Sequence, residues 1–212
     1  TESEPNNRPA DATALFSDQE ITGAIGFPAP GLRADEDFYV LRHRGNPGDL
    51  LDLTVTGVDG IDLVLEVHNI QGERIARSNR AKAGGPEVLH NLLWRGDELF
   101  VSVRELWTQG IPSRSSPGTP YTISVHPHPS SPQQEQEPNG RVELAAPLNH
   151  GDIRRGWISA RSDRDLFTLP PLPIDGRVIG IDLTPGPDQH LAVALVNGTG
   201  REINRFSPRP GK

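Results

Sequence analysis

Two short segments of similar sequence contain the side chains that are best suited to bind a cation. They are TESEPNN at residues 1–7 and EQEPNG at residues 135–140. Each combines two carboxylates, a proline and an asparagine. Carboxylate, amide and backbone carbonyl oxygens are the hard ligands that calcium takes, six to eight at a time and in loose geometry. These segments are therefore candidate metal ligands if the fold brings further oxygens to them.

The spacing of the oxygens in the first segment suits a shared site. Side chains alternate along an extended chain, so Glu2, Glu4 and Asn6 lie on one side of it. Asp35 and Asp37 share a side in the same way, at the start of a predicted aromatic strand. If the two stretches meet without a cation, their four carboxylates repel one another.

The acidic segments belong to a longer internal repeat, which must be recognised before the fold is predicted. ADEDFYVL at residues 34–41 matches SDRDLFTL at residues 162–169. The same offset aligns residues 51–78 with residues 179–206 without a gap, whereas the two acidic segments are slightly further apart. One ancestral unit is therefore present twice, with a small length change between the acidic segment and the D-x-D motif.

The elements that would position these residues are short strands. Apolar or alternating runs are separated by turn residues, and no segment has convincing helical periodicity. This pattern predicts an all-β fold of tandem antiparallel β-sandwich domains. The strands expected in the first copy are residues 21–26, 37–41, 50–56, 62–69, 74–78, 88–93, 98–103 and 121–125.

The repeat also sets the expected domain limits. Residues 1–126 form the first sandwich, residues 127–134 a linker rich in Pro, Ser and Gln, and residues 135–212 the second copy. Lys212 corresponds to Gly84, so the second copy lacks the last strands of the first. We expect that these strands are cut off rather than supplied by another chain.

Composition excludes several classes of function. The formal charge is −7 and Lys and Arg are not clustered, so we expect no nucleic-acid partner. We also expect no membrane span, because no apolar run approaches the roughly 20 residues that one needs. The absence of Cys excludes disulfides and thiolate sites. Because the chain begins at Thr1 and has no Met, we expect that it was processed or cut from a longer chain.

Catalytic motifs are absent from the sequence, so we predict no enzymatic activity and no catalytic residue. The chain has 7 His, and His126 and His128 in HPHP form the closest pair. Such a pair can bind zinc. It lies in a Pro-rich stretch without an obvious third ligand, so an exposed spacer is the simpler interpretation.

Aromatic residues suggest a second kind of binding surface. Trp107 begins a long loop, and loops of that length are often functional. If the first copy recognises a polymer or a protein, Trp107, Tyr121 and Arg104 are the predicted ligand-binding residues. A partly covered surface Trp is the alternative, and Trp94 is expected to pack in the core.

The ordered motifs ESEPNN, DEDFYVL, DLVLEVHNIQGERIARS, LLWRGDELFVSV and PYTISV resemble the bacterial pre-peptidase C-terminal domain, which is related to the collagen-binding domains of clostridial collagenases. The resemblance covers nearly all of the first copy and the front part of the second. It implies a jelly-roll-like β-sandwich that acts as a non-catalytic accessory module of a secreted, periplasmic or cell-surface protein.

The resemblance also implies calcium, because some members bind it where the E-x-E-x-N segment folds back beside the D-x-D loop. Gly140 stands where Asn7 does, so the second site should be weaker or absent. Ordinary lead-in and turn chemistry is the alternative for both. The matching candidate ligands are Glu2, Glu4, Asn6, Asn7, Asp35 and Asp37 in the first copy, and Glu135, Glu137, Asn139, Asp163 and Asp165 in the second.

Three functions stay open from the sequence: a structural spacer, a carbohydrate- or matrix-protein-binding module, and a processing or targeting domain of a secreted protease. The expected partners are an extracellular polymer or protein and the rest of a longer parent chain. Calcium is the only cofactor expected.

Overall fold

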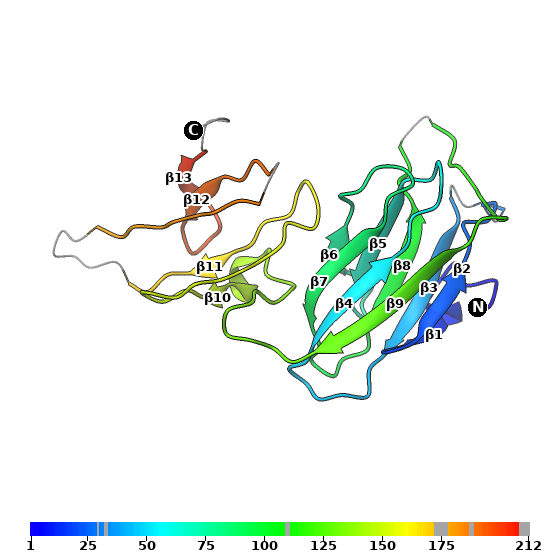
Figure 1. Cartoon of the computed structure of the whole chain (residues 1–212), viewed down its shortest axis with the longest axis horizontal. Helices are drawn as coiled ribbons and strands as arrows, with labels where there is room; N and C mark the ends of the chain where they lie inside the picture. The colour runs from blue at the N-terminus through cyan, green and yellow to red at the C-terminus, as the bar shows by residue number, and fades with distance from the viewer. Residues whose placement is uncertain (29, 32–33, 109–110, 172–177, 187–188, 208–212) are drawn as a thin grey trace. The chain divides into compact units, whose positions relative to one another are not determined.

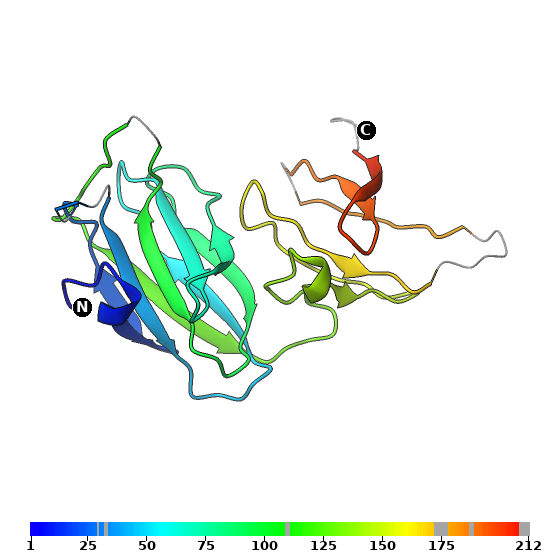
Figure 2. The ribbon, with the colours of Figure 1, turned by 180° about the vertical axis from the view of Figure 1, so that it is seen from behind.

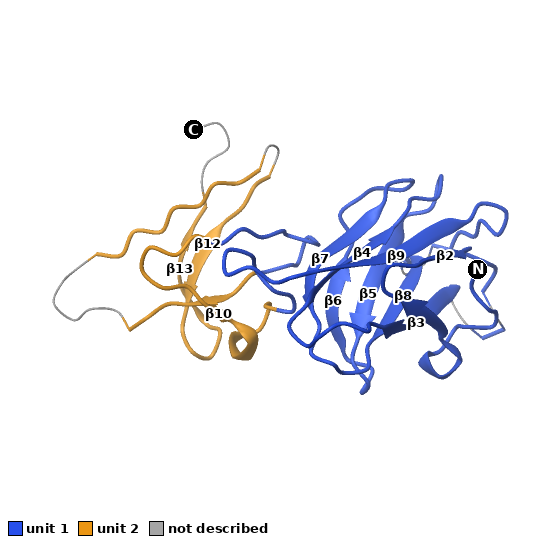
Figure 3. Ribbon diagram, turned by 60° about the horizontal axis from the view of Figure 1, so that its bottom comes forward, with its two compact units in different colours: residues 1–138, 154–164 blue, residues 139–153, 165–212 orange. Residues whose placement is uncertain are grey.

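The computed structural model describes residues 1–28, 30–31, 34–108, 111–171, 178–186 and 189–207. Its regular structure in these ranges consists of β-strands and two short 3-10 helices, which confirms the all-β fold class. The chain forms two compact units, coloured separately in Figure 3. Unit 1 contains residues 1–138 and 154–164, and unit 2 contains residues 139–153 and 165–212.

Unit 1 is a sandwich of two sheets (Figures 1 and 2). One sheet has five strands in the order β1-β3-β8-β5-β6, and the other has four in the order β2-β9-β4-β7. Neighbouring strands are antiparallel except β1 and β3, which are parallel. The elements are η1 (Pro9–Asp11), β1 (Thr13–Phe16), β2 (Glu20–Gly23), β3 (Glu36–Arg42), β4 (Leu50–Val55), β5 (Leu63–His68), β6 (Arg74–Ser78), β7 (Glu87–Leu93), β8 (Phe100–Glu105) and β9 (Tyr121–His128).

The core of unit 1 lies between the two sheets. Strand alternation sends every second side chain inward, so Leu51 and Leu53 of β4 meet the core together with Ile123 and Val125 of β9. All four are fully buried. Because one face of each strand is fixed by this burial, the opposite faces and the strand ends position the polar groups described below.

Strand β9 is longer than the sequence predicts. It pairs with β4 as far as His128, opposite Leu50, and so includes the first two residues of the predicted linker, 127–134. Residues 154–164, which the repeat assigns to the second copy, belong to unit 1. The first three residues of the HPHP motif are therefore part of a sheet and not of a linker, although His126 is exposed.

In its described residues, unit 2 has short elements only. They are η2 (Val142–Leu144), β10 (Ala146–Pro147), β11 (Phe167–Thr168), β12 (Val193–Val196) and β13 (Glu202–Phe206). Strands β10 and β11 are parallel, and β12 and β13 form an antiparallel hairpin. Several of its described apolar side chains are largely exposed, among them Val178 (92%), Ile203 (64%) and Phe206 (63%).

Among the described residues, no helix has both the length and the apolar character that crossing a membrane requires.

Candidate metal centre

The N-terminal segment lies against the strands that carry the D-x-D motif. The backbone N–H of Glu2 donates to the carbonyl of Thr22 in β2 at 2.9 Å. The N–H of Phe38 in β3 donates to the carbonyl of Asn6 at 2.9 Å. These two bonds hold the E-x-E-x-N segment beside β2 and β3, as the family resemblance implies.

Three carboxylates converge at this place. One oxygen each of Glu2, Glu4 and Asp37 lie within 4.8 Å of one another. The N–H of Ala24 donates to Glu2 Oε1 at 2.8 Å, and the N–H of Asn6 donates to Glu4 Oε2 at 2.9 Å. These backbone bonds fix the orientation of both glutamates.

Asp35 and Asn7 lie at the edge of this group. Asp35 Oδ2 accepts the N–H of Gly26 at 2.5 Å, and the side chain is almost fully buried. Asn7 Oδ1 accepts the N–H of Glu36 at 3.4 Å, at the first residue of β3. Asn7 thus caps the strand, while Asp35 adds negative charge next to the cluster.

Two buried tyrosines form the floor of the cluster. Tyr39 donates its hydroxyl hydrogen to Glu2 Oε2 at 2.7 Å, and Tyr121 donates to Asp37 Oδ2 at 2.5 Å. The two hydroxyl oxygens are 2.6 Å apart. The sequence places Tyr121 on a ligand-binding surface, but it is fully buried and faces the acidic cluster.

Two oxygens of the cluster are buried and lack a hydrogen-bond donor among the described residues. They are Asn6 Oδ1 and Asp37 Oδ1, and both residues are 0% exposed. A buried acceptor without a partner is costly, about 1–3 kcal/mol for a neutral group and more for a charged one. A cation that accepts oxygen ligands would remove this cost.

The raised pKa values of the cluster carboxylates also show that their negative charge lacks a compensating positive charge. Burial, assisted by the negative charge of Glu2 and Asp35, raises the pKa of Asp37 to about 8 despite the hydrogen bond from Tyr121. Burial likewise raises the pKa of Glu4 and of Asp35. In the part of the chain that the structure describes, none of these carboxylates forms an ion pair with Lys or Arg.

Sequence reasoning overlooked Gly23 and Tyr39. A Cβ atom at Gly23 would lie 2.6 Å from Glu2 Oε2 and 2.6 Å from the Tyr121 side chain, so only glycine fits. Tyr39 follows Asp37 by two residues and therefore points to the same face of β3. That alternation was the signal from which Tyr39 could have been added to the site.

The candidate ligands of the second copy are divided between the two units. Glu135, Glu137 and Asp163 belong to unit 1, whereas Asn139 and Asp165 belong to unit 2. One oxygen of Glu135 and one of Glu137 lie within 4.8 Å of each other, and both side chains are buried. Burial raises the pKa of Asp163 even though two backbone N–H groups donate to its carboxylate.

Hydrogen bonds around the two acidic segments recur at matching positions of the sequence repeat. The bond from Glu2 N to the Thr22 carbonyl has its counterpart in the bond from Glu135 N to the Arg155 carbonyl at 2.9 Å. Four further features recur in the same way. The bond from Ala24 N to Glu2 Oε1 corresponds to that from Trp157 N to Glu135 Oε1, and the bond from Gly26 N to Asp35 Oδ2 corresponds to that from Ser159 N to Asp163 Oδ2. The bond from Phe38 N to Asn6 O corresponds to that from Leu166 N to Asn139 O. The parallel strand pair β1–β3 corresponds to the parallel pair β10–β11.

Another acidic group in unit 1 is already neutralised. Glu36, Glu66 and His68 offer ligand atoms within 4.8 Å of one another. Arg74 Nη1 lies 2.7 Å and Arg104 Nη2 3.1 Å from the Glu66 carboxylate, and they lower the pKa of Glu66 against the effect of its burial. The guanidinium groups take the place that a metal ion would need.

The predicted ligand-binding residues do not form one surface. Trp107 lines a cavity of about 240 Å³ together with Glu105 and Arg114. Arg104 pairs with Glu66, and its side chain is 22% exposed. With Tyr121 in the acidic cluster, Trp107 is the member of this set that lines a surface cavity.

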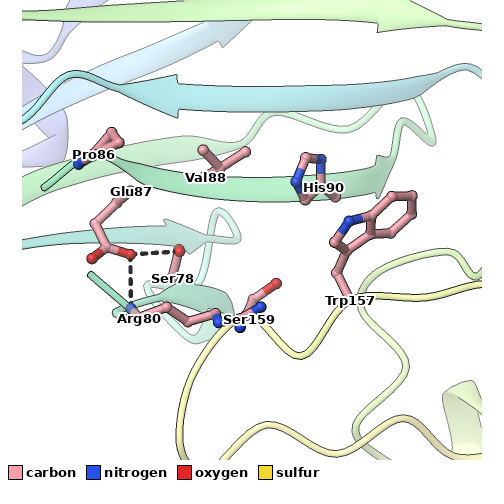
Figure 4. A pocket seen from close by; sticks show the side chains of 8 residues that line it. All are labelled: Ser78, Arg80, Pro86, Glu87, Val88, His90, Trp157 and Ser159. Atoms are coloured by element: carbon pink, nitrogen blue, oxygen red, sulfur yellow. Dashed lines mark hydrogen bonds between the residues drawn. The ribbon is translucent and has the colours of Figure 1, made fainter. Parts of the chain in front are cut away.

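A second cavity, of about 190 Å³, lies beside β7 (Figure 4). Its buried carboxylate, Glu87, accepts hydrogen bonds from Ser78 Oγ at 2.7 Å and from the N–H groups of Arg80 and Ala81. Trp157 stands beside His90 at its rim, with the ring centroids 4.6 Å apart. The carboxylate of Glu87 in the cavity lining is thus satisfied by the protein itself.

No protein-family model matches the chain, and no curated protein sequence matches it. Among solved structures, the pre-peptidase C-terminal domain of a Bacillus anthracis collagenase is similar at 17% identity and a TM-score of 0.37, covering 57% of this chain and 99% of that one. PliG of Aeromonas hydrophila, a periplasmic inhibitor of g-type lysozyme, is similar at 13% identity and a TM-score of 0.37, covering 55% of this chain and 97% of that one.

Proposed function

We propose that this chain is a non-catalytic accessory module of an exported protein, and that a calcium ion at the acidic cluster fastens its N-terminal segment to the sandwich. The setting outside the cytoplasm and the accessory role rest on the family resemblance of the sequence. The calcium site rests on the geometry of Glu2, Glu4 and Asp37.

The single observation that carries the calcium proposal is the convergence of three carboxylates around buried oxygens that have no donor. Glu2, Glu4 and Asp37 lie within 4.8 Å of one another, and Asn6 Oδ1 and Asp37 Oδ1 are buried without a partner. Hard, anionic and amide oxygens in an irregular arrangement are the ligand set of calcium. The protonated cluster is the alternative state, which the raised pKa of Asp37 describes.

Calcium would act by binding the folded state only. Glu2 and Glu4 come from the N-terminal segment and Asp37 from β3, so the site exists only when the segment is docked. A ligand present at 100 times its dissociation constant stabilises the folded state by about 2.7 kcal/mol. The expected result is a stiffened lead-in to the sandwich.

For the second set, Glu135, Glu137, Asn139, Asp163 and Asp165, the proposal is a weaker calcium site. The hydrogen bonds of the first segment that recur around the second segment support it. The missing side-chain oxygen at Gly140 is the reason to expect lower affinity.

Calcium titration by calorimetry, with thermal unfolding in calcium and in chelator, tests the proposal. We expect one tight site, a second weaker site or none, and a higher melting temperature in calcium. Asp37→Asn should abolish the tight site, and Glu20→Gln, an exposed residue of the adjacent strand β2, should preserve it. Absence of binding heat in the wild type, or tight binding by Asp37→Asn, would contradict the proposal.

Recognition of an extracellular polymer or protein is the second candidate function, and the cavity beside Trp107 is the observation that favours it. Trp107→Ala should lower the retention of the chain on an immobilised polysaccharide or matrix protein without changing its melting temperature. Equal retention of both proteins would leave the spacer role as the better account.

A further inference from the structure

Three of the 7 histidines lie on one outer face of the four-stranded sheet, and two of them, His90 and His128, contact a single carboxylate. Asp52 is in the middle strand β4, and His126 and His128 are in β9 on one side of it. His90 is in β7 on the other side. The core-facing residues Leu51 and Leu53 flank Asp52, so this group points away from the core.

The register of the sheet brings these side chains together. Asp52 is directly opposite His126, and Leu50 is directly opposite His128. Directly opposite residues on one face have Cβ atoms about 5 Å apart. Two residues apart on one strand, His126 and His128 share this face. His128 contacts the Asp52 carboxylate, and the exposed His126 side chain would join it by rotating toward its opposite residue.

A bulge in β7 turns its histidine and a backbone donor toward the same carboxylate. The register between β4 and β7 shifts at this point, and Asn91 has a φ of 57°. The N–H of Asn91 donates to Asp52 Oδ1 at 2.9 Å. His90 Nδ1 lies 3.2 Å from Asp52 Oδ2. The Asp52 carboxylate is thereby held from the β7 side.

Two oxygen atoms flank the imidazole of His128. His128 Nδ1 lies 3.3 Å from the carbonyl oxygen of Pro129, and Nε2 lies 3.4 Å from Asp52 Oδ1. Both neighbours are acceptors, but a neutral imidazole has only one N–H. The tautomer with the proton on Nε2 donates to Asp52, whereas the tautomer with the proton on Nδ1 presents the Nε2 lone pair beside the carboxylate, which is the arrangement of two metal ligands.

We propose that Asp52, His126 and His128 bind a divalent transition-metal ion of the zinc class, and that His90 is a positioning residue that holds the carboxylate. Two imidazoles and one carboxylate are a ligand set that zinc accepts, with water as the fourth ligand. In such sites the second nitrogen of a ligating His usually donates to a carbonyl or a carboxylate, and the carbonyl oxygen of Pro129, 3.3 Å from His128 Nδ1, is placed to accept such a bond. About 30% of the Asp52 side chain and 29% of the His128 side chain are exposed, so an ion can enter.

This site is distinct from the proposed calcium cluster in both chemistry and place. Tyr121, which contacts the calcium cluster, begins β9, and His128 ends it. Seven residues along a strand correspond to roughly 23 Å. Imidazole ligands favour zinc, nickel and copper, whereas an all-oxygen site favours calcium.

The test is zinc titration of the complete, tag-free chain in saturating calcium, with cobalt(II) as a spectroscopic substitute. We expect about one zinc ion per chain and a visible cobalt spectrum of tetrahedral type. His126→Ala and His128→Ala should each weaken zinc binding at least tenfold, and His90→Gln should weaken it by roughly tenfold through loss of orientation. His150→Ala, an exposed His of unit 2, should bind zinc as the wild type does.

Melting temperatures in chelator show whether each variant is folded, and Asp52→Asn provides a second way to remove a ligand without touching a histidine. The proposal is overturned if the wild type gives no saturable zinc binding. It is also overturned if folded His126→Ala and His128→Ala proteins keep the wild-type affinity, because the ion would then bind elsewhere, for example at His43 and Asp49, whose Nε2 and Oδ2 are 2.9 Å apart. Asp37→Asn should leave zinc binding unchanged, which separates this result from the fate of the calcium site.

Discussion

At the scale of single residues, the acidic cluster is a case in which the fold places like charges together. Asp37 is fully buried, and its nearest hydrogen-bond donor is a tyrosine and not a cation. A carboxylate in such a place takes up a proton or a metal ion, since isolated buried charge is too costly to keep. The two states differ in charge, so pH and calcium must compete for the site.

Asp37 should make the stability of the calcium-free protein decrease with rising pH. Its pKa is raised to about 8 in the fold, against about 3.9 in an unfolded chain. Between these pH values the folded state holds a proton on Asp37 that the unfolded state has lost. The stabilisation of the fold by this proton is therefore complete below about pH 4 and is lost as pH rises toward 8. The slope from this group is at most about 1.4 kcal/mol per pH unit.

Urea unfolding in chelator across this pH range measures the slope, and Asp37→Asn should remove most of it. Glu20→Gln should keep the wild-type slope, since Glu20 is exposed. An unchanged slope in Asp37→Asn would mean that another group titrates. With calcium present the trend should reverse, because the ion binds the ionised carboxylate.

Gly23→Ala should damage the cluster through its shape alone. The added methyl group would lie 2.6 Å from both Glu2 Oε2 and the Tyr121 side chain. Overpacking of this kind costs about 1–3 kcal/mol, and the displaced Glu2 should also weaken calcium binding. Gly118→Ala is the matched control, because nothing lies within 4 Å of a Cβ there. Equal stability of the two variants in chemical unfolding would show that Glu2 moves aside freely.

At the scale of elements, alternation predicted most strands of unit 1 and failed where a strand has an unusual neighbour. Strand β1 was missed because it has four residues and pairs in parallel with β3. Strand β9 was predicted to end at Val125, two residues before Pro127, which cannot donate to a ladder. Strand β2 pairs with β9 only from Tyr121 to Ser124, so Pro127 lies where β4 is the sole partner.

The candidate site was predicted only in part. The first acidic segment and the D-x-D motif were paired through the family resemblance, and the structure brings Glu2, Glu4 and Asp37 together. Tyr121 was misplaced because it follows the long loop of Trp107, although its alternation with Ile123 and Val125 indicates an inward side chain. The contacts of Asp52 with His90 and His128 were missed because these three residues, which are far apart in the sequence, are brought together only by strand pairing across the sheet.

Glu87 should be important for the connection between β6 and β7, which belong to different sheets. Its buried carboxylate accepts three hydrogen bonds from residues 78–81. Glu87→Gln keeps the size but turns an NH₂ group toward backbone donors, which should cost about 1–3 kcal/mol. Chemical unfolding measures this loss, and Glu143→Gln, at an exposed site, should show none. A loss below that of an ordinary surface substitution would mean that water replaces the missing acceptor.

At the scale of the whole molecule, the two units differ in how much apolar surface they bury. The buried hydrophobic cluster of unit 1 draws on both sheets. In the described part of unit 2, large apolar side chains such as Ile181, Ile203 and Phe206 are exposed. A two-stranded hairpin without a covered apolar face is marginally stable in water. The units should therefore differ in local stability.

Hydrogen exchange followed by mass spectrometry should show this difference directly. Amides of β4, β5 and β8 are in the interior of unit 1 sheets and should exchange only on global unfolding. Amides of β12 and β13 should exchange far faster, because opening this hairpin exposes little further apolar surface. Calcium should slow exchange at β2 and β3, which flank the acidic cluster, and leave β12 and β13 unchanged. Protection of β12 as strong as that of β4 would show that its apolar side chains are covered in solution, and the partner that covers them would then have to be sought.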